Sequence, residues 1–290
     1  MSLLKPFGRN PLEQRLERLR RSQNYQKDSF QNVQPTPMSR EGVTMVRMIF
    51  EFFLKPKPKD IRPSQPLPTL STNLHELSDQ TPTLVWFGHS SYLIKYQGKN
   101  ILIDPVFSGH ASPVKNVISS FPGTDSYQVK DFPKIDLLLI THDHYDHLDF
   151  KTVCEFRSQV DKAVMPLGVG EHFEHWGYDT KKLTELDWWE SFKLSDDIRV
   201  TATPARHFSG RGLKRNKSLW ASFVLELGPH KIFIGGDSGY DEQFKKIGEA
   251  HGPFDLAILE CGQYNENWPY IHMFPEETAQ AAADLKAKVL

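Results

Sequence analysis

The amino-acid sequence predicts a layered α/β domain. Short apolar runs end at turn residues, and longer amphipathic stretches lie among and after them. Strands that precede, alternate with and follow helices are typical of layered α/β architectures. Residues 1–80 differ from the rest because they are polar, basic and interrupted by prolines. We therefore expect an N-terminal arm over residues 1–80 and one main domain over residues 81–290.

Each expected element has a local reason. The turn at residues 97–100 separates two apolar runs and predicts a hairpin. Residues 135–140 are apolar almost throughout, which suits a strand buried on both faces. Pro275 and the two glutamates after it are typical of a helix start. Expected strands cover residues 84–87, 92–96, 101–104, 135–140, 164–167, 198–203, 222–227, 231–234 and 256–259. Expected helices cover residues 150–158, 242–251 and 276–286, and residues 12–21 of the arm have helical composition.

Composition narrows the class of protein. The 290 residues are 39% hydrophobic and 24% charged, as in an ordinary globular protein, and a formal net charge of -1 gives no general attraction to nucleic acid. Two cysteines do not make a disulfide framework and fit a reducing compartment. No secretory signal opens the sequence, and the apolar residues 45–54 are too few to span a bilayer, which takes roughly 20. We expect a cytoplasmic protein.

A histidine-rich run follows the buried strand expected at residues 135–140. It reads His142-Asp143-His144-Tyr145-Asp146-His147. The end of a buried strand is where sites of α/β proteins usually lie, and alternate residues of an extended segment point the same way. Imidazole nitrogens and carboxylate oxygens suit zinc or a similar divalent ion. The run therefore predicts a metal-binding loop, and the alternative is a histidine-rich surface loop.

Two further strand ends carry candidate ligands. His207 follows the strand expected at residues 198–203, and Asp237 lies between glycines after the strand expected at residues 231–234. A carboxylate can join two metal ions, and glycines let the backbone approach closely. Taken alone, His207 would more often be a packing residue, and Gly-Asp-Ser-Gly would more often be a turn. The histidine run favours metal ligation for both.

These motifs resemble those of the metallo-β-lactamase superfamily. The pattern is His142-x-His144-x-Asp146-His147, followed by His207 and Asp237. Further segments resemble the branch of the N-acylphosphatidylethanolamine phospholipases D, and the resemblance covers about residues 28–290. These segments are residues 30–36, 86–91, 104–108, 111–113, 185–190, 252–257 and 272–277. They do not fix a substrate.

The resemblance implies a fold and a set of ligands. The fold is an αββα sandwich with two zinc ions at one edge of its sheets. His142, His144 and His207 would hold one ion, Asp146 and His147 the other, and Asp237 would bridge them. The family also expects one more histidine on a strand after the last helix. Residues 288–290 look like the beginning of that strand, so either the sequence is C-terminally truncated or the second zinc ion is weakly held. We expect truncation, with the last strand or strands missing, and two zinc ions per chain of which the second lacks this histidine here.

The resemblance also implies a mechanism. Hydroxide held between the metal ions would attack phosphorus and expel an alcohol. Asp146 and Asp237 would orient the hydroxide, and His272 would contact the phosphate or assist the leaving oxygen. His89 and Asp104 are candidates for orienting the ligands, although His89 is equally a turn histidine. Aromatic residues that either line an apolar substrate channel or belong to the core are Trp188, Trp189, Tyr264 and Trp268.

The sequence is compatible with three functions. The first is a zinc-dependent phospholipase D-like phosphodiesterase acting on N-acylphosphatidylethanolamine or a related phospholipid. The second is a soluble lactonase or phosphoesterase of the same superfamily, and the third is a non-catalytic metal-binding module. A small-molecule or phospholipid substrate is expected and nucleic acid is not. Residues 45–54 suit either peripheral membrane contact or packing on the domain itself. The oligomeric state is open, with a homodimer among the options.

Overall fold

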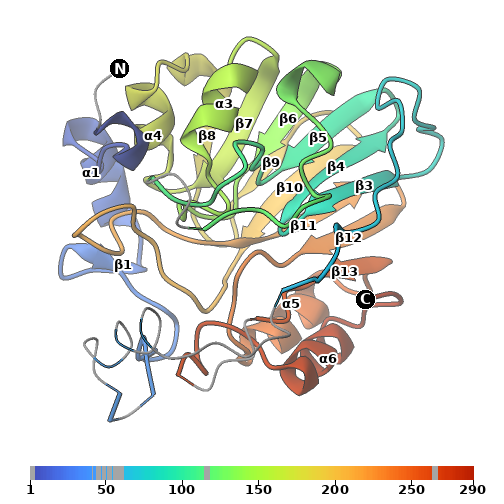
Figure 1. Ribbon diagram of the computed structural model, residues 1–290. Coiled ribbons are helices and arrows are strands. Elements are labelled where there is room, and N and C mark those ends of the chain that lie inside the picture. The colour runs from blue at the N-terminus through green and yellow to red at the C-terminus, as the bar shows by residue number, and fades with distance from the viewer. Residues whose placement is uncertain are drawn as a thin grey trace.

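Two β-sheets face each other, with helices on their outer faces, in the computed structural model (Figure 1). The structure describes residues 4–40, 42, 43, 47, 50, 54, 62–113, 118–262 and 267–290. The order of the layers is helix, sheet, sheet, helix. This confirms the αββα sandwich of the metallo-β-lactamase fold.

The first sheet has six strands. In spatial order they are β3 (Thr83–Gly88), β4 (Ser91–Tyr96), β5 (Lys99–Ile103), β6 (Ile135–Leu139), β7 (Val160–Pro166) and β8 (Leu183–Leu186). β3, β4 and β5 form an antiparallel meander, whereas β5 to β8 run parallel. The central β6 is therefore covered on both faces, as its apolar sequence predicts.

The second sheet has five strands. In spatial order they are β13 (Leu256–Ile258), β12 (His230–Ile234), β11 (Ser222–Leu227), β10 (Ile198–Thr203) and β9 (Ser191–Lys193). β9 to β12 are antiparallel, and β13 joins β12 in parallel. Beyond β13, Ala257 N–H donates to Val289 O and Lys288 N–H donates to Phe254 O, both at 2.9 Å. Residues 287–289 thus run beside β13.

Helices cover both outer faces. α3 (Phe150–Phe156) and α4 (Gly170–His175) pack on the six-stranded sheet, and α5 (Gln243–Ala250) and α6 (Pro275–Asp284) pack on the five-stranded sheet. Asp149 caps α3 by accepting a hydrogen bond from Lys151 N–H. Short 3-10 helices are η1 (Lys5–Phe7), η2 (Val129–Asp131) and η3 (Thr180–Lys182). No helix in the described ranges is long and apolar enough to cross a bilayer.

Apolar residues alternate between two cores along the strands of the first sheet. Ile103 and Leu139 point between the sheets, where they join Phe223 of β11. Leu102 and Leu138 point to the outer layer with α3 and α4. This alternation follows from the two-residue period of a strand, and it fixes the register on which the ends of β6, β10 and β12 depend.

The first part of the arm is built into the domain. It contains α1 (Glu13–Arg21), β1 (Tyr25–Gln26) and β2 (Ser29–Phe30). Leu19 and Phe30 are fully buried in the core between the sheets. The arm segment from residue 4 to residue 40 therefore wraps on the main domain. The stretch considered for membrane contact, residues 45–54, lies outside the described residues except at positions 47, 50 and 54, and the expected extended segment 55–59 lies outside them entirely.

All nine strands expected from the sequence are present, as are the four helical segments. β1, β2, β8, β9, α4 and the 3-10 helices were not expected. Each of these elements has at most seven residues, and none has a continuous apolar run. Their pairing partners lie far away in the sequence or at a tight turn, so local periodicity does not report them.

Candidate metal centre

The predicted ligands converge at one end of the sandwich because they follow strands that end there. The run from His142 to His147 follows β6 of the first sheet. His207 follows β10 and Asp237 follows β12, both in the second sheet. The site therefore lies where the two sheets meet, in loops held by a rigid scaffold.

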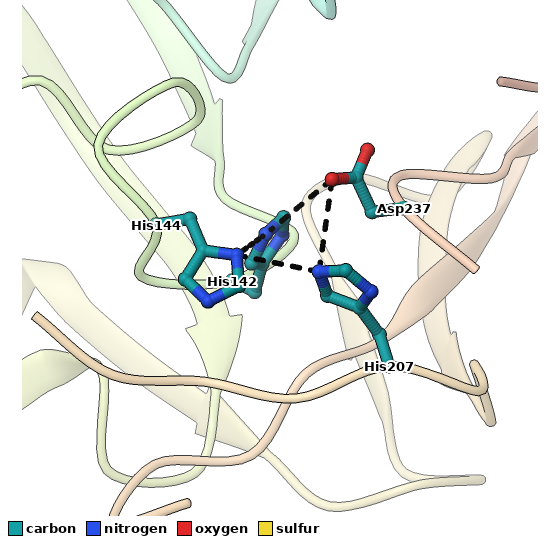
Figure 2. Close-up of side chains that lie close together, drawn as sticks. All are labelled: His142, His144, His207 and Asp237. Atoms are coloured by element: carbon teal, nitrogen blue, oxygen red, sulfur yellow. Dashed lines mark hydrogen bonds and ion pairs between the residues drawn. The ribbon is translucent and has the colours of Figure 1, made fainter. Parts of the chain in front are cut away.

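Four side chains form the first donor group: His142, His144, His207 and Asp237. Figure 2 shows them pointing toward one another from both sheets. His144 Nδ1 is 2.9 Å from His142 Nε2 and 3.3 Å from His207 Nε2. Asp237 Oδ2 is 3.9 Å from His142 Nε2 and 3.7 Å from His207 Nε2.

These separations fit a shared cation. Donors placed about 2.1 Å from a tetrahedral zinc ion would be about 3.4 Å apart, and the four measured separations lie on both sides of that value. Three imidazole nitrogens and one carboxylate oxygen are also a donor set that zinc and iron accept. The first group therefore fits a divalent transition metal.

A second donor group lies beside the first and consists of His89, Asp146 and His147. His89 Nε2 is 3.4 Å from Asp146 Oδ2. His147 Nε2 is fully buried and has no hydrogen-bond partner in the described part of the chain, although Asp237 Oδ1 is 3.2 Å away. A buried polar atom without a partner is costly unless something else binds it. This nitrogen faces the site, where a metal ion would take the place of a proton.

Contacts on the far side of the rings orient two of the histidines. The buried carboxylate of Asp104 accepts a 2.8 Å hydrogen bond from His147 Nδ1 and a 2.6 Å bond from Thr141 Oγ1. His207 Nδ1 donates to Ile271 O at 2.9 Å. Each contact fixes a proton on Nδ1 and leaves Nε2 free for a metal ion. Asp104 thus has the orienting position expected of it, and His89 lies against the carboxylate of Asp146.

Burial sets the protonation of the imidazoles. Burial lowers the pKa of His207 to about 3 and also lowers the pKa values of His142 and His144. These rings are therefore neutral, which is the form that binds metals. Burial opposes protonation of His147 as well, but the carboxylates of Asp237 and Asp104 raise its pKa well above the usual value. His147 thus lies in a negative field that attracts a cation.

Asp143 lies between His142 and His144 in the sequence and holds the histidine-rich loop in place through hydrogen bonds on the side away from the metal ligands. Its buried carboxylate accepts hydrogen bonds from Ser218 Oγ and Gly210 N at 2.7 Å, and His172 Nε2 lies 3.2 Å away. Although burial acts in the opposite direction, the contact with His172 holds its pKa below the usual range. The sequence assigns no role to Asp143, and the alternation of the run is the one local sign that its side chain points away from the metal side.

A cavity of 710 Å³ opens directly onto both donor groups. Its apolar wall is formed by Met38, Phe208, Ile258, Leu259, Trp268 and Ile271. His272 also lines it, and its ring centroid lies 5.2 Å from that of His207. Glu260, which the sequence did not single out, lies 3.3 Å from His272 Nδ1. That contact leaves Nε2 of His272 for a bound molecule.

The aromatic candidates separate into wall and core. Trp268 lines the cavity. Trp188 is buried between the sheets and donates from Nε1 to Trp220 O. Trp189 is exposed and stacks on His251. Tyr264 lies outside the described residues. Only one of the four tryptophans and tyrosines named from the sequence is therefore placed at the cavity.

Comparisons with known proteins agree with this geometry. A family model described as "Beta-lactamase superfamily domain" matches residues 99–290. An uncharacterized protein of Mycobacterium tuberculosis is 40% identical over 266 residues, which are 91% of this chain and 71% of that protein. The N-acyl-phosphatidylethanolamine-hydrolyzing phospholipase D 1 of Caenorhabditis elegans is 33% identical over 221 residues, with 70% of this chain and 60% of that protein covered. The mitochondrial enzyme of the same name in Saccharomyces cerevisiae is 36% identical over 217 residues, with coverages of 70% and 45%.

Solved structures share the fold. Igni18, a metallo hydrolase from Ignicoccus hospitalis, superposes with a TM-score of 0.55 at 21% identity, covering 72% of this chain and 80% of its own. CmlA, a diiron β-hydroxylase from Streptomyces venezuelae, gives 0.56 at 21% identity, with coverages of 74% and 45%. The matched family model, the relatives and the clustered donors lead to one conclusion. The chain belongs to the metallo-β-lactamase superfamily and is a metal-dependent hydrolase similar to the N-acylphosphatidylethanolamine phospholipases D.

Proposed function

We propose that the protein is a zinc-dependent phosphodiesterase of the phospholipase D type that acts on N-acylphosphatidylethanolamine or a related phospholipid. The observation that carries this proposal is the apolar cavity beside the His/Asp cluster. Its volume of 710 Å³ lies in the range of pockets for sizeable ligands, roughly 300–1,000 Å³. A lipid requires an apolar wall next to the reacting group, whereas a sugar lactone requires a small polar pocket. The names of the worm and yeast relatives point to the same substrate class.

Two zinc ions are the proposed cofactors. His142, His144 and His207 would hold one ion, and Asp146 and His147 the other, with Asp237 between them. Asp237 suits that place because Oδ2 faces the first group while Oδ1 lies 3.2 Å from His147 Nε2. When bound, the metals lower the pKa of a coordinated water to about 7 and neutralise the phosphate.

The protein's own residues would guide the reaction. Asp237 and Asp146 accept hydrogen bonds from the attacking water and orient its oxygen toward phosphorus. A new P–O bond forms to the water oxygen, one water proton passes to a carboxylate of Asp146 or Asp237, and the P–O bond to the N-acylethanolamine breaks. His272 Nε2 donates a proton to the departing oxygen, and Glu260 holds that ring in place through Nδ1. The products are phosphatidate and N-acylethanolamine, and the apolar wall keeps bulk water away from the site.

Hydrolysis in H₂¹⁸O tests the proposal. Zinc-loaded protein is incubated with N-acylphosphatidylethanolamine in mixed micelles, and the products are measured by mass spectrometry. We expect one ¹⁸O in phosphatidate and none in N-acylethanolamine, because water attacks phosphorus. Absence of both products, with turnover of a lactone instead, would make the protein a lactonase. Metal analysis of the same sample checks the cofactors, and two zinc ions per chain are expected.

A further inference from the structure

The side-chain amide of Asn32 binds both backbone polar groups of His207, its N–H and its C=O. Asn32 Nδ2 donates to His207 O at 2.7 Å, and His207 N–H donates to Asn32 Oδ1 at 3.1 Å. Trp220 Nε1 donates to the same Oδ1 at 3.2 Å and to Ala205 O at 2.8 Å. The two N–H donors fix which end of the amide is the oxygen, because a flipped amide would set its N–H₂ group against both.

This pairing substitutes for a β-ladder. His207 lies past the end of β10, one residue beyond the isolated bridge between Arg206 and Gly239, and no strand of the described residues pairs with it. A primary amide presents a donor and an acceptor side by side, as the N–H and C=O of one residue in a neighbouring strand do, so Asn32 supplies the missing partner. Phe30, fully buried between the sheets, anchors the arm two residues earlier. The buried side chain of Phe30 therefore fixes the position of the segment that carries the Asn32 amide.

Neighbouring contacts connect the same loop to the other strand-end ligand. Arg206 N–H donates to Ser238 Oγ at 2.9 Å, and Gly239 N–H donates to Arg206 O at 2.9 Å. Ser238 and Gly239 are the two residues that follow Asp237. The arm reaches this place too, because Arg206 Nε donates to Thr36 Oγ1 at 3.1 Å. The backbone that carries His207 is therefore fixed from the arm on one side and from the Asp237 loop on the other.

We propose that Asn32 is a positioning residue of the metal centre, and that the N-terminal arm is part of that centre and not an appendage. Asn32 holds the His207 backbone so that Nε2 stays 3.3 Å from His144 Nδ1 and 3.7 Å from Asp237 Oδ2. The proposal rests on the proposed metal ligation by His207. Groups that hold metal ligands in place typically change metal affinity by about 10–100-fold when they are removed.

The test compares metal affinity in three proteins. Asn32→Ala removes the amide, and Gln31→Ala is the matched control because the Gln31 amide is exposed and, among the residues that the structure describes, binds Gln26 and Ser29 of the arm. Affinity is measured by competition with a chromogenic chelator, and the Co²⁺-loaded proteins are compared by their visible absorption. We expect Asn32→Ala to bind the tighter-held ion about 10–100-fold more weakly with an altered Co²⁺ spectrum, and Gln31→Ala to match the parent.

Two further variants make every outcome informative. Asn32→Asp keeps the size and the acceptor but places a carboxylate against His207 O, so it should also weaken metal binding. It replaces Asn32→Ala if that variant does not fold by near-ultraviolet circular dichroism. Parent-like affinity and spectrum in a folded Asn32 variant would overturn the proposal. His207→Ala, measured in parallel, distinguishes failure of the Asn32 proposal from failure of metal ligation by His207. If His207→Ala also leaves metal affinity unchanged, the assignment of the metal centre itself is wrong.

Discussion

Asp237 is the residue on which both donor groups depend. Its Oδ2 atom faces His142 and His207, and its Oδ1 atom lies 3.2 Å from His147 Nε2. Asp237→Asn keeps the shape but removes the charge and one acceptor. We expect metal content to fall toward zero and turnover to fall below detection, while near-ultraviolet circular dichroism stays that of the parent. His144→Ala should behave in the same way. Retained turnover in either folded variant would show that the metal mechanism is misassigned.

Asp104 acts on the metal centre through His147, whose ring it orients. Its carboxylate is fully buried and accepts hydrogen bonds from His147 Nδ1 and from both Thr141 N and Thr141 Oγ1. Asp104→Asn replaces an acceptor oxygen by an N–H₂ group. That group faces one of those donors, so one hydrogen bond is lost. We expect metal affinity to weaken by about 10–100-fold, measured by chelator competition. Asp196→Asn is the control because Asp196 is exposed, far from the metal centre in the fold's β9–β10 turn, and pairs with Lys193. Equal affinity in the two variants would contradict an orienting role for Asp104.

The sequence predicts the residues at the metal because they are locally marked. The six-residue run after β6, and single candidates after β10 and β12, follow apolar strands, and the structure brings all six predicted metal ligands together. The supporting residues are not marked in this way. Asn32 and His207 are 175 positions apart, and Asp143 reaches Ser218 across 75. No local pattern reports such contacts, since they arise only when distant strands pack.

At the scale of elements, α1 is held to the domain by a partly buried ion-pair cluster. Arg15 contacts Glu171 at 2.7 Å and Glu185 at 2.8 Å, and the three side chains are 15%, 3% and 10% exposed. Arg18 pairs with Glu190 at 2.9 Å, but these side chains are about half exposed. Arg15→Ala would remove one partner from each of two buried carboxylates, while Glu171 keeps its contact with Arg9 and Glu185 Oε1 keeps two backbone N–H donors. The free energy of unfolding should therefore fall by about 1.5–3 kcal/mol.

Arg18→Ala is the matched control on the same helix. A solvent-exposed pair contributes at most about 1 kcal/mol, so its loss should be smaller than that of Arg15→Ala. Urea denaturation of both variants measures the difference. A larger effect from Arg18→Ala would mean that the contacts of Arg15 do not hold α1 to the domain.

Elements were predictable where local chemistry and tertiary packing agree. β6 is apolar and buried, and α6 begins with Pro275 followed by glutamates, so both are visible in the sequence. β9 is a three-residue edge strand with an exposed, partly buried, exposed pattern, and the six residues of α4 begin at a glycine. These elements form because a neighbouring strand or a covered sheet face stabilises them. The residues of β9 and α4 do not by themselves predict a strand or a helix.

At the scale of the whole molecule, the metal centre lies on the seam between the sheets. His142, His144 and His147 come from the six-stranded sheet, whereas His207 and Asp237 come from the five-stranded sheet. Bound metal would therefore join the two halves of the sandwich. Unfolding that separates the sheets must also break the metal sites, so metal binding and global stability are linked.

Removal of metal should therefore lower the melting temperature of the entire domain. A ligand present at 100 times its Kd stabilises the folded state by about 2.7 kcal/mol, which corresponds to about 5–10 °C in Tm for a domain of this size class. Calorimetry of zinc-loaded and chelator-treated protein measures the shift, and added Zn²⁺ should restore the original Tm while Mg²⁺ should not, because the donors are mainly imidazoles. Equal Tm values for the two samples would show that the cation does not connect the sheets, and the histidine cluster would then need another explanation.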